Sequence, residues 1–185
     1  REQIAIKNGE DKSTLSGLFL YYVERDAQGD TQNDTGATID GGMEALTNTG
    51  ICKEATVPYD ITKFTIKPSA AAYTEAAQFK IHDAKNLAGL DDVKTAINAG
   101  QTVAFGFRVY DSFRKIGADG MMTVPKPGEK LLGGHAVLAV GYDDEKKVLI
   151  VRNSWSAAWG DKGYFYMPYE VAKSSQVHEY WTASK

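Results

Sequence analysis

The stretch Gly133–Pro168, which reads GGHAVLAVGYDDEKKVLIVRNSWSAAWGDKGYFYMP, decides how the second part of this chain folds. Two short apolar runs, residues 136–141 and 148–151, are bounded by turn residues and predict buried β-strands. A polar turn separates them, so the two runs most simply form a β-hairpin. Pairing the strands brings His135 and Asn153 to the same end of that hairpin. An imidazole beside a side-chain amide is a base with the group that orients it, which is two of the three parts of a nucleophilic catalytic site.

The rest of the chain predicts a helical first part and a strand-rich second part. Residues 39–48 have the apolar spacing of a helix that ends before Gly50. From residue 79 onward strand patterns dominate, most strongly at residues 102–109. A second helix is predicted by a stripe of apolar residues at helical spacing: Leu15, Leu18, Phe19, Tyr22 and Val23.

This division predicts an α+β protein of two lobes. We expect residues 1–78 to form the remainder of a helical lobe, and residues 79–185 to form the strand-rich lobe that carries His135 and Asn153. A site in the cleft between two lobes would be typical of such a protein.

Composition argues against several classes of partner. The 185 residues include 21 Lys and Arg against 24 Asp and Glu, so the formal net charge is −3, and no basic block is present. Nucleic acid and anionic membranes are therefore not expected partners. No apolar run approaches the roughly 20 residues that span a bilayer, and no signal peptide is visible, so localisation stays open. The single cysteine excludes an intrachain disulfide and a zinc site of clustered cysteines, and we expect neither a metal nor a cofactor.

His135 and Asn153 are the residues best suited to chemistry. Gly133 and Gly134 precede the histidine and leave room for a partner backbone or a substrate to approach the ring. The Asn153 amide oxygen can accept a hydrogen bond from the imidazole, and Trp155 could cover that bond and exclude water. The alternative is that the histidine and asparagine only satisfy each other in the core of the hairpin, since a lone histidine usually performs no chemistry.

Several segments resemble papain-like cysteine proteases. GGHAVLAVGYD and VRNSWSAAWGDKGYFYMP resemble the family's histidine and asparagine segments, in the family's order and spacing. Upstream, TLSGLFLYY resembles the segment after the family's catalytic helix. GATIDGGMEALTNTGICKEATVPYD resembles the Gly-rich substrate-binding segment and the helix that follows it. The likeness is closest to bacterial members and covers nearly the whole chain.

The resemblance implies a two-lobe papain-like fold with a β-barrel-like second lobe, and it implies a role for each matching residue. His135 would be the base, Asn153 its orienter, and Trp155, with Trp159 in support, the shield. Gly36 and Ala37 would form the strand-like edge that binds the substrate backbone. The residues expected to contact a peptide or protein substrate are Gly36, Ala37, Ile39 and Gly134. Ser156 is a departure, because the family usually has glycine after Asn-Ser-Trp.

The nucleophile is the larger departure. The family's cysteine precedes its histidine and asparagine by about 130–150 residues, which places it between roughly position 5 and about 15 residues before Arg1. Residues 1–51 contain no cysteine, and Cys52 is expected to be a small buried hydrophobic residue. We therefore expect the catalytic cysteine to lie outside this chain, on an upstream segment or a separate chain.

Two functions follow from these residues. The first is a papain-type cysteine peptidase, endo- or exo-acting, whose nucleophile is supplied from elsewhere. The second is an inactive papain-like scaffold that binds peptides or proteins. Retention of His135, Asn153 and Trp155 favours the peptidase, because a non-catalytic descendant has no chemical reason to keep all three.

Overall fold

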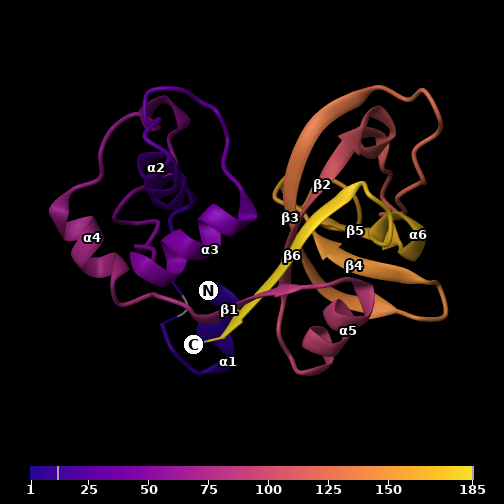
Figure 1. Cartoon of the computed structure of the whole chain (residues 1–185), viewed down its shortest axis with the longest axis horizontal. Coiled ribbons are helices and arrows are strands. Elements are labelled where there is room, and N and C mark those ends of the chain that lie inside the picture. The colour runs from indigo at the N-terminus through magenta and orange to yellow at the C-terminus, as the bar shows by residue number, and fades with distance from the viewer. Residues whose placement is uncertain (12, 185) are drawn as a thin grey trace. The chain divides into compact units, whose positions relative to one another are not determined.

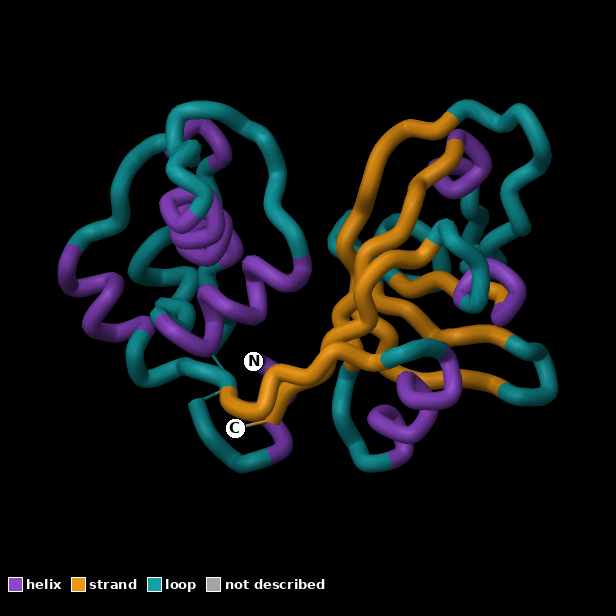
Figure 2. The backbone as a smooth tube through the Cα atoms, in the orientation of Figure 1, coloured by secondary structure: helices purple, strands orange, loops and turns teal. Residues whose placement is uncertain are grey.

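The structure is a computed structural model, and it describes residues 1–11 and 13–184. It divides into two compact units: one comprises residues 1–84 with the end of the chain from Ala183, and the other comprises Lys85–Thr182. Helices dominate the first unit and strands dominate the second (Figure 1, Figure 2). The α+β class predicted from the sequence is confirmed.

The first unit is built from short helices. Its elements are α1 (Glu2–Lys7), α2 (Gly17–Ala27), α3 (Ile39–Asn48), the 3-10 helix η1 (Ile61–Lys63) and α4 (Ala70–Ala76). Ser16 begins α2, because its hydroxyl accepts a hydrogen bond from the Phe19 N–H at 3.0 Å. Thr38 begins α3 in the same way, with Gly41 as the donor, and the bounds of α3 are those predicted from the sequence.

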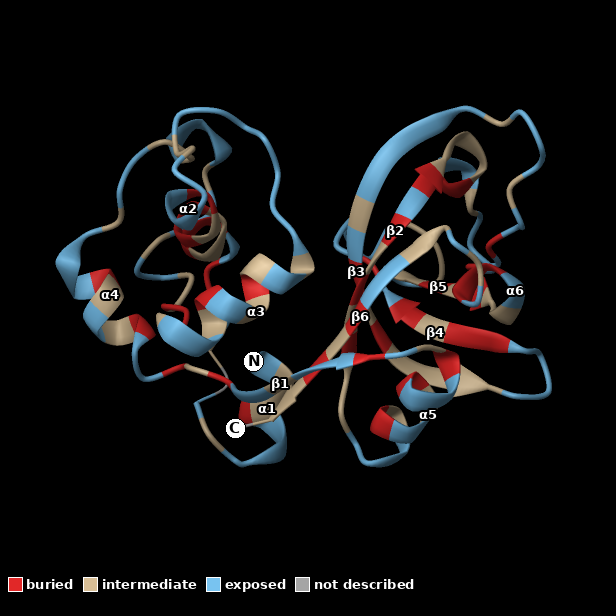
Figure 3. Ribbon diagram, viewed as in Figure 1, coloured by how far each residue is buried: buried red, intermediate tan, exposed pale blue. Residues whose placement is uncertain are grey.

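The core of the first unit lies under α2, α3 and α4. Figure 3 shows buried segments on each of these helices. Of the predicted apolar stripe, Phe19 and Val23 of α2 lie in this core, and Leu15, which precedes the helix, packs against it. Phe19 and Cys52 are completely buried. Burial of this stripe, rather than helix propensity alone, accounts for the stability of so short a helix.

The second unit is built around one sheet. Its elements are β1 (His82–Leu87), α5 (Leu90–Asn98), β2 (Val103–Tyr110), the 3-10 helix η2 (Asp111–Lys115), β3 (Leu131–Asp143), β4 (Val148–Arg152), β5 (Tyr164–Pro168), α6 (Tyr169–Ala172) and β6 (Val177–Ser184). The strands lie in the order β1-β6-β2-β3-β4-β5, and strands β1 and β6 each run across the boundary between the two units. Inward residues alternate along β2, so that Val103, Phe105, Phe107 and Val109 are all buried.

The second lobe was expected to be β-barrel-like, and its sheet is not closed, with β1 and β5 as its edge strands. The reason lies at the outer edge of β5. The Tyr166 N–H donates to the Gly120 carbonyl at 2.8 Å, and the Tyr166 carbonyl accepts from the Met122 N–H at 3.1 Å. Residues 120–122 therefore occupy the hydrogen-bonding edge that a barrel would need for closure.

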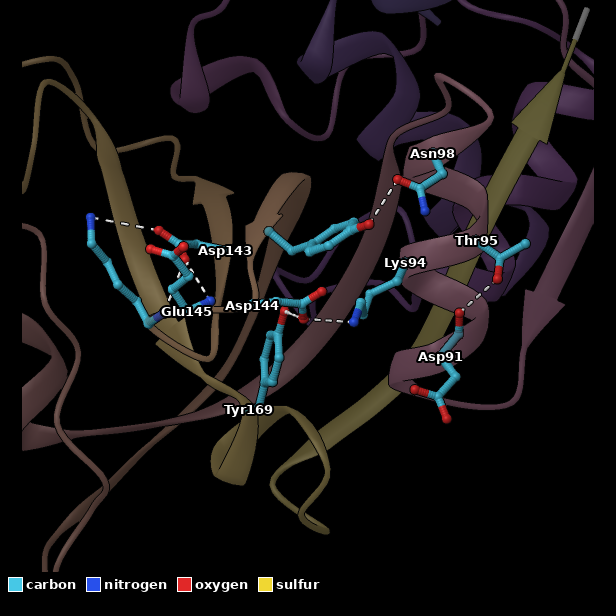
Figure 4. A network of polar contacts seen from close by, with 10 residues as sticks. Asp91, Lys94, Thr95, Asn98, Asp143, Asp144, Glu145 and Tyr169 are labelled. Carbon is cyan, nitrogen blue, oxygen red and sulfur yellow. Dashed lines mark hydrogen bonds and ion pairs between the residues drawn. The ribbon is translucent and has the colours of Figure 1, made fainter.

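A polar network fastens α5 to the sheet of the second unit (Figure 4). The Lys94 ammonium pairs with Asp144 at 2.6 Å, and the Tyr169 hydroxyl donates to the same Asp144 oxygen at 2.8 Å. The Tyr142 hydroxyl donates to Asn98 Oδ1 at 2.8 Å, and its ring centroid lies 4.8 Å from the Lys94 nitrogen. The network joins α5, the β3–β4 turn and α6.

Glu24 of α2 is a half-buried carboxyl group packed against α3. A methyl group added at Gly42 would lie 2.6 Å from Glu24 Oε1, so the carboxyl group fills the space that glycine leaves. Burial raises the pKa of Glu24 from 4.5 to about 7, and the charge of Arg25 offsets part of that shift.

Because the pKa of Glu24 is raised in the folded state, folding favours its protonated form. The contribution of Glu24 to the free energy of unfolding should therefore be largest below pH 4.5, and it should fall as the pH rises to about 7. We expect Glu24→Gln to remove this dependence and to be more stable than the parent at pH 8 by about 1–3 kcal/mol. Urea unfolding at pH 5 and pH 8 measures the difference.

Glu44→Gln, at an exposed glutamate of α3, is the matched control and should leave the pH dependence unchanged. A Glu24→Gln variant whose stability follows the parent across this pH range would contradict the expectation.

Candidate active site

Strand pairing brings His135 and Asn153 together. His135 lies on β3 opposite Phe107 of β2. Asn153 directly follows Arg152, the last residue of β4, which pairs with Leu138 of β3. The predicted contact forms, with 2.8 Å between His135 Nε2 and Asn153 Oδ1.

The hydrogen bonds around Asn153 define the protonation of the imidazole. The Ser154 N–H donates to Asn153 Oδ1 at 2.8 Å, so this atom is the amide oxygen and acts only as an acceptor. His135 Nε2 must then carry the proton that it shares with Asn153. In the neutral ring the lone pair lies on Nδ1, which has no hydrogen-bond partner among the described residues. Nδ1 is therefore the nitrogen able to act as a base.

Aromatic rings surround this hydrogen bond. The Trp155 ring centroid lies 5.0 Å from the His135 centroid, with 31° between the planes. Phe107 and Phe113 lie 6.1 and 6.3 Å from the imidazole. Asn153 is 8% exposed, whereas Trp155 is 37% exposed. The indole thus stands between solvent and the hydrogen bond, which is stronger where water is excluded.

Trp159 supports the covering indole. Its ring centroid lies 5.2 Å from that of Trp155 at an interplanar angle of 76°, and 5.2 Å from that of Phe113. Phe165 lies beneath, 5.9 Å from Trp159 and 4.9 Å from Phe113. All of these contacts are edge-to-face except that between Trp159 and Phe113, which is tilted at 44°, and together they fix the position of Trp155.

The sequence analysis did not predict that three of these aromatic residues support the site. Phe107 was predicted only as a strand residue, although the alternation of residues 102–109 already placed it on the buried face, and Phe165 was given no role in the site. Phe113 lies in η2, where no periodic pattern marks it. Aromatic support for a histidine is set by tertiary contacts that no local spacing reveals.

The loop from Asn153 to Gly163 is closed at its base. The Asn153 N–H donates to the Gly163 carbonyl at 2.9 Å, and the Gly163 N–H donates to the Trp159 carbonyl at 2.8 Å. Gly160 has φ +58°, and a Cβ there would lie 2.4 Å from the Tyr164 carbonyl oxygen. Only glycine fits, so this residue allows the tight turn that presents the two tryptophans.

The remaining predicted site residues fall into two groups. Gly134 is exposed on β3, next to His135 in the sequence, and its contact with a substrate stays a prediction from the resemblance. Gly36 and Ala37 are exposed in the loop before α3, and Ile39 is the half-buried first residue of that helix. These three belong to the first unit, and their role in substrate binding stays a prediction from the resemblance.

Cys52 does not have the properties of a nucleophile. Its side chain is completely buried in the core of the first unit. Burial first, and the charge of Glu75 second, raise the pKa of the Cys52 thiol to about 11. At neutral pH such a thiol is deprotonated in roughly one molecule in 10,000, so it is inert.

Neither a metal site nor a membrane span is found in the part of the chain that the structure describes. No group of three or more His, Cys, Asp and Glu side chains converges there. No helix there is long and apolar enough to cross a bilayer.

Ser156, the departure noted in the sequence, has φ +76°. This left-handed conformation suits glycine and is strained for a residue with a Cβ. The serine hydroxyl partly compensates by accepting a hydrogen bond from the Ala158 N–H at 3.3 Å.

We expect Ser156→Gly to stabilise the protein by roughly 0.5–1 kcal/mol. This net value is the strain relieved in the folded state minus the cost of the greater conformational entropy that glycine gives the unfolded chain. Thermal unfolding should show a rise in Tm of about 1–4 °C. The control is Ser154→Gly at a neighbouring position with negative φ, where the same change should not stabilise. Equal effects at both positions would argue against strain at Ser156.

Comparison with known proteins places this geometry in context. A model described as papain family cysteine protease matches residues 2–184. Xylellain, a cysteine protease from Xylella fastidiosa, has a solved structure that superposes with a TM-score of 0.91 at 33% identity. That match covers 100% of this chain and 75% of the xylellain chain.

Two further relatives are similar in sequence. An uncharacterized peptidase C1-like protein of Acanthamoeba polyphaga mimivirus is 37% identical over 178 residues, which cover 90% of this chain and 57% of the viral protein. Thiol protease aleurain of Arabidopsis thaliana is 37% identical over 125 residues, which cover 65% of this chain and 34% of that protein. The chain thus spans only part of the length of these relatives.

Xylellain supports the expected likeness to bacterial members, while these two relatives come from a virus and a plant. The family match extends over nearly all of the sequence, on both units of the structure. The chain belongs to the papain family of cysteine proteases.

Proposed function

We propose that this chain is the base-bearing part of a cysteine peptidase that hydrolyses peptide bonds through a thioester acyl-enzyme. The observation that carries the proposal is the 2.8 Å contact between His135 Nε2 and Asn153 Oδ1. It leaves Nδ1 as the base and holds the ring in one orientation under Trp155.

In the proposed mechanism, His135 carries the proton in both halves of the reaction. A cysteine thiolate attacks the peptide carbonyl carbon while Nδ1 holds the thiol proton. The C–N bond then breaks as Nδ1 donates that proton to the leaving amine, and a thioester remains. Water attacks the thioester and gives a proton to Nδ1, and the C–S bond breaks to release the acid and the thiolate. Asn153 keeps the imidazole oriented and stabilises its protonated form throughout.

The nucleophile would come from outside this sequence, on an upstream segment or a separate chain. Three observations support this part of the proposal. Cys52 is buried and has a raised thiol pKa, and residues 1–51 contain no cysteine. The xylellain chain has a further quarter of its length outside the matched region.

The second candidate is an inactive papain-like scaffold that binds peptides or proteins. The lack of a reactive cysteine within these residues favours it. The ordered His135–Asn153 pair favours the peptidase, because peptide binding alone does not need an oriented base.

The first test replaces the base and its orienter in the full-length protein. We expect His135→Ala to lower kcat/KM on a peptide substrate by about 10²–10⁴-fold, the usual contribution of general acid–base catalysis. Asn153→Ala should lower it by about 10–100-fold, because an orienting group acts only through the base. Hydrolysis of a fluorogenic peptide measures both changes.

Asn98→Ala is the matched control for Asn153→Ala. It also removes an amide oxygen that accepts a hydrogen bond from a side chain. Asn98 lies in the network of Figure 4, however, and that network includes none of the candidate site residues. Equal losses from both asparagine variants, or full activity in His135→Ala, would contradict the assigned roles.

The second test locates the nucleophile. The full-length protein is incubated with a thiol-directed peptidyl inhibitor, and its intact mass is measured and the adduct mapped. We expect one adduct, on a cysteine outside residues 1–185, with Cys52 unmodified. The absence of an adduct, together with serine, alanine or glycine at the expected upstream position, would exclude the peptidase and leave the peptide-binding scaffold.

A further inference from the structure

The loop that leads into α3 is held by two side chains of α2. Tyr21 and Arg25 are four residues apart, so they project from the same face of the helix. Their partners in this loop lie within residues 31–36, the segment immediately before Ala37. The only cysteine of this sequence is Cys52, so no disulfide within the sequence holds this loop.

Arg25 is a buried cation whose hydrogen bonds go to backbone carbonyls. Its guanidinium is completely buried and donates to the carbonyls of Thr31 and Asn33 at 2.9 and 3.2 Å, and to that of Phe64. It also lies over the rings of Tyr21 and Phe64, at 4.2 and 5.0 Å from their centroids. A planar guanidinium suits this task because its fixed fork of donors can join several segments at once.

Tyr21 holds the end of the loop. Its hydroxyl donates to Asp34 and accepts a hydrogen bond from the Gly36 N–H at 3.1 Å. Burial, and then the hydrogen bond to Asp34, raise the pKa of Tyr21, so the hydroxyl keeps its proton and serves as donor and acceptor together. Gly36 takes φ +77°, a left-handed turn that directs the chain into Ala37.

Ala37 is left with unpaired backbone groups. It is exposed, and its N–H and C=O have no hydrogen-bond partner among the described residues. Thr38, which follows it, is extended at φ −104° and ψ +156° before it begins α3. The loop therefore presents a short extended edge with a free donor and a free acceptor, the geometry that pairs with an extended peptide.

We propose that Tyr21 and Arg25 are positioning residues for peptide recognition: they hold the loop so that the backbone of Ala37 pairs with an extended peptide. The inference rests on the peptide recognition in the proposed function and deepens it. Arg25 fixes the carbonyls of the loop, and Tyr21 occupies the Gly36 N–H. The Ala37 N–H and C=O are then the groups that remain free to pair.

The test measures peptide binding in variants of the full-length protein that all carry His135→Ala, so that the peptide is not cleaved. The probes are Ac-Ala-Leu-Ala-Ala-NH2 and the same peptide with an N-methyl group on the leucine amide. The methyl group removes a backbone donor and leaves the side chain intact. NMR titration gives Kd, and hydrogen exchange reports on the Gly36 amide.

Tyr21→Phe is the informative variant, because it keeps the ring over Arg25 and removes only the hydroxyl. We expect faster exchange of the Gly36 amide and about a three- to tenfold weaker Kd for the unmethylated peptide. N-methylation should raise the Kd of the peptide for the parent protein. The same methyl group should raise the Kd by a smaller factor in Tyr21→Phe, because the Tyr21 hydroxyl and the peptide N–H are expected to act on the same contact.

The control is Tyr169→Phe, which loses the same kind of tyrosine–aspartate hydrogen bond in the network of Figure 4. It should bind both peptides as the parent does. Equal weakening by both variants would assign the effect to general stability and overturn the inference. So would an unchanged Kd in Tyr21→Phe, or a parent indifferent to N-methylation.

One outcome separates this inference from the function on which it rests. If the parent binds neither peptide, peptide recognition itself fails, and both proposals fall. If the parent binds and Tyr21→Phe matches it, only the positioning role falls.

Discussion

The hydrogen bond between His135 Nε2 and Asn153 Oδ1 joins side chains 18 positions apart, and the candidate site depends on it. It exists only because the end of β4 pairs with β3 in a fixed register, with Leu138 opposite Arg152 and Ala139 opposite Val151. A slip of one residue would turn the side chains of β4 to the other face of the sheet. The same slip would expose Val151, which is completely buried, so burial of the core protects the geometry of the site.

The aromatic cluster gives the second requirement, a dry environment for that bond. Trp155 can remain at the surface because Trp159 and Phe113 hold its ring from below. The closed loop before Gly163 brings both tryptophans to the same place. The hydrophobic core and the candidate site thus share a residue, because Phe113 belongs both to the core of the second unit and to the rings around the imidazole.

Strong local patterns allowed much of this to be predicted. The helix at residues 39–48 and the hairpin that pairs His135 with Asn153 follow from apolar period and turn chemistry. The open sheet was not predicted, because residues 120–122 cover β5 through contacts distant in sequence. The loop anchors were also missed. A tyrosine and an arginine on a helix usually indicate a solvated face, and only the folded loop shows Arg25 to be buried.

Coverage of the outer edge of β5 also bears on solubility. An edge strand with apolar side chains and free backbone groups is a template for pairing with another molecule. Gly120, at φ +67°, packs its α-carbon against the Tyr166 ring, where an added Cβ would lie 3.1 Å from the ring carbons. A side chain there would be strained by the positive φ, and the Tyr166 ring or the segment would have to shift by a few tenths of an ångström. The same short segment that keeps the sheet from closing therefore also guards the folded chain against edge-to-edge aggregation.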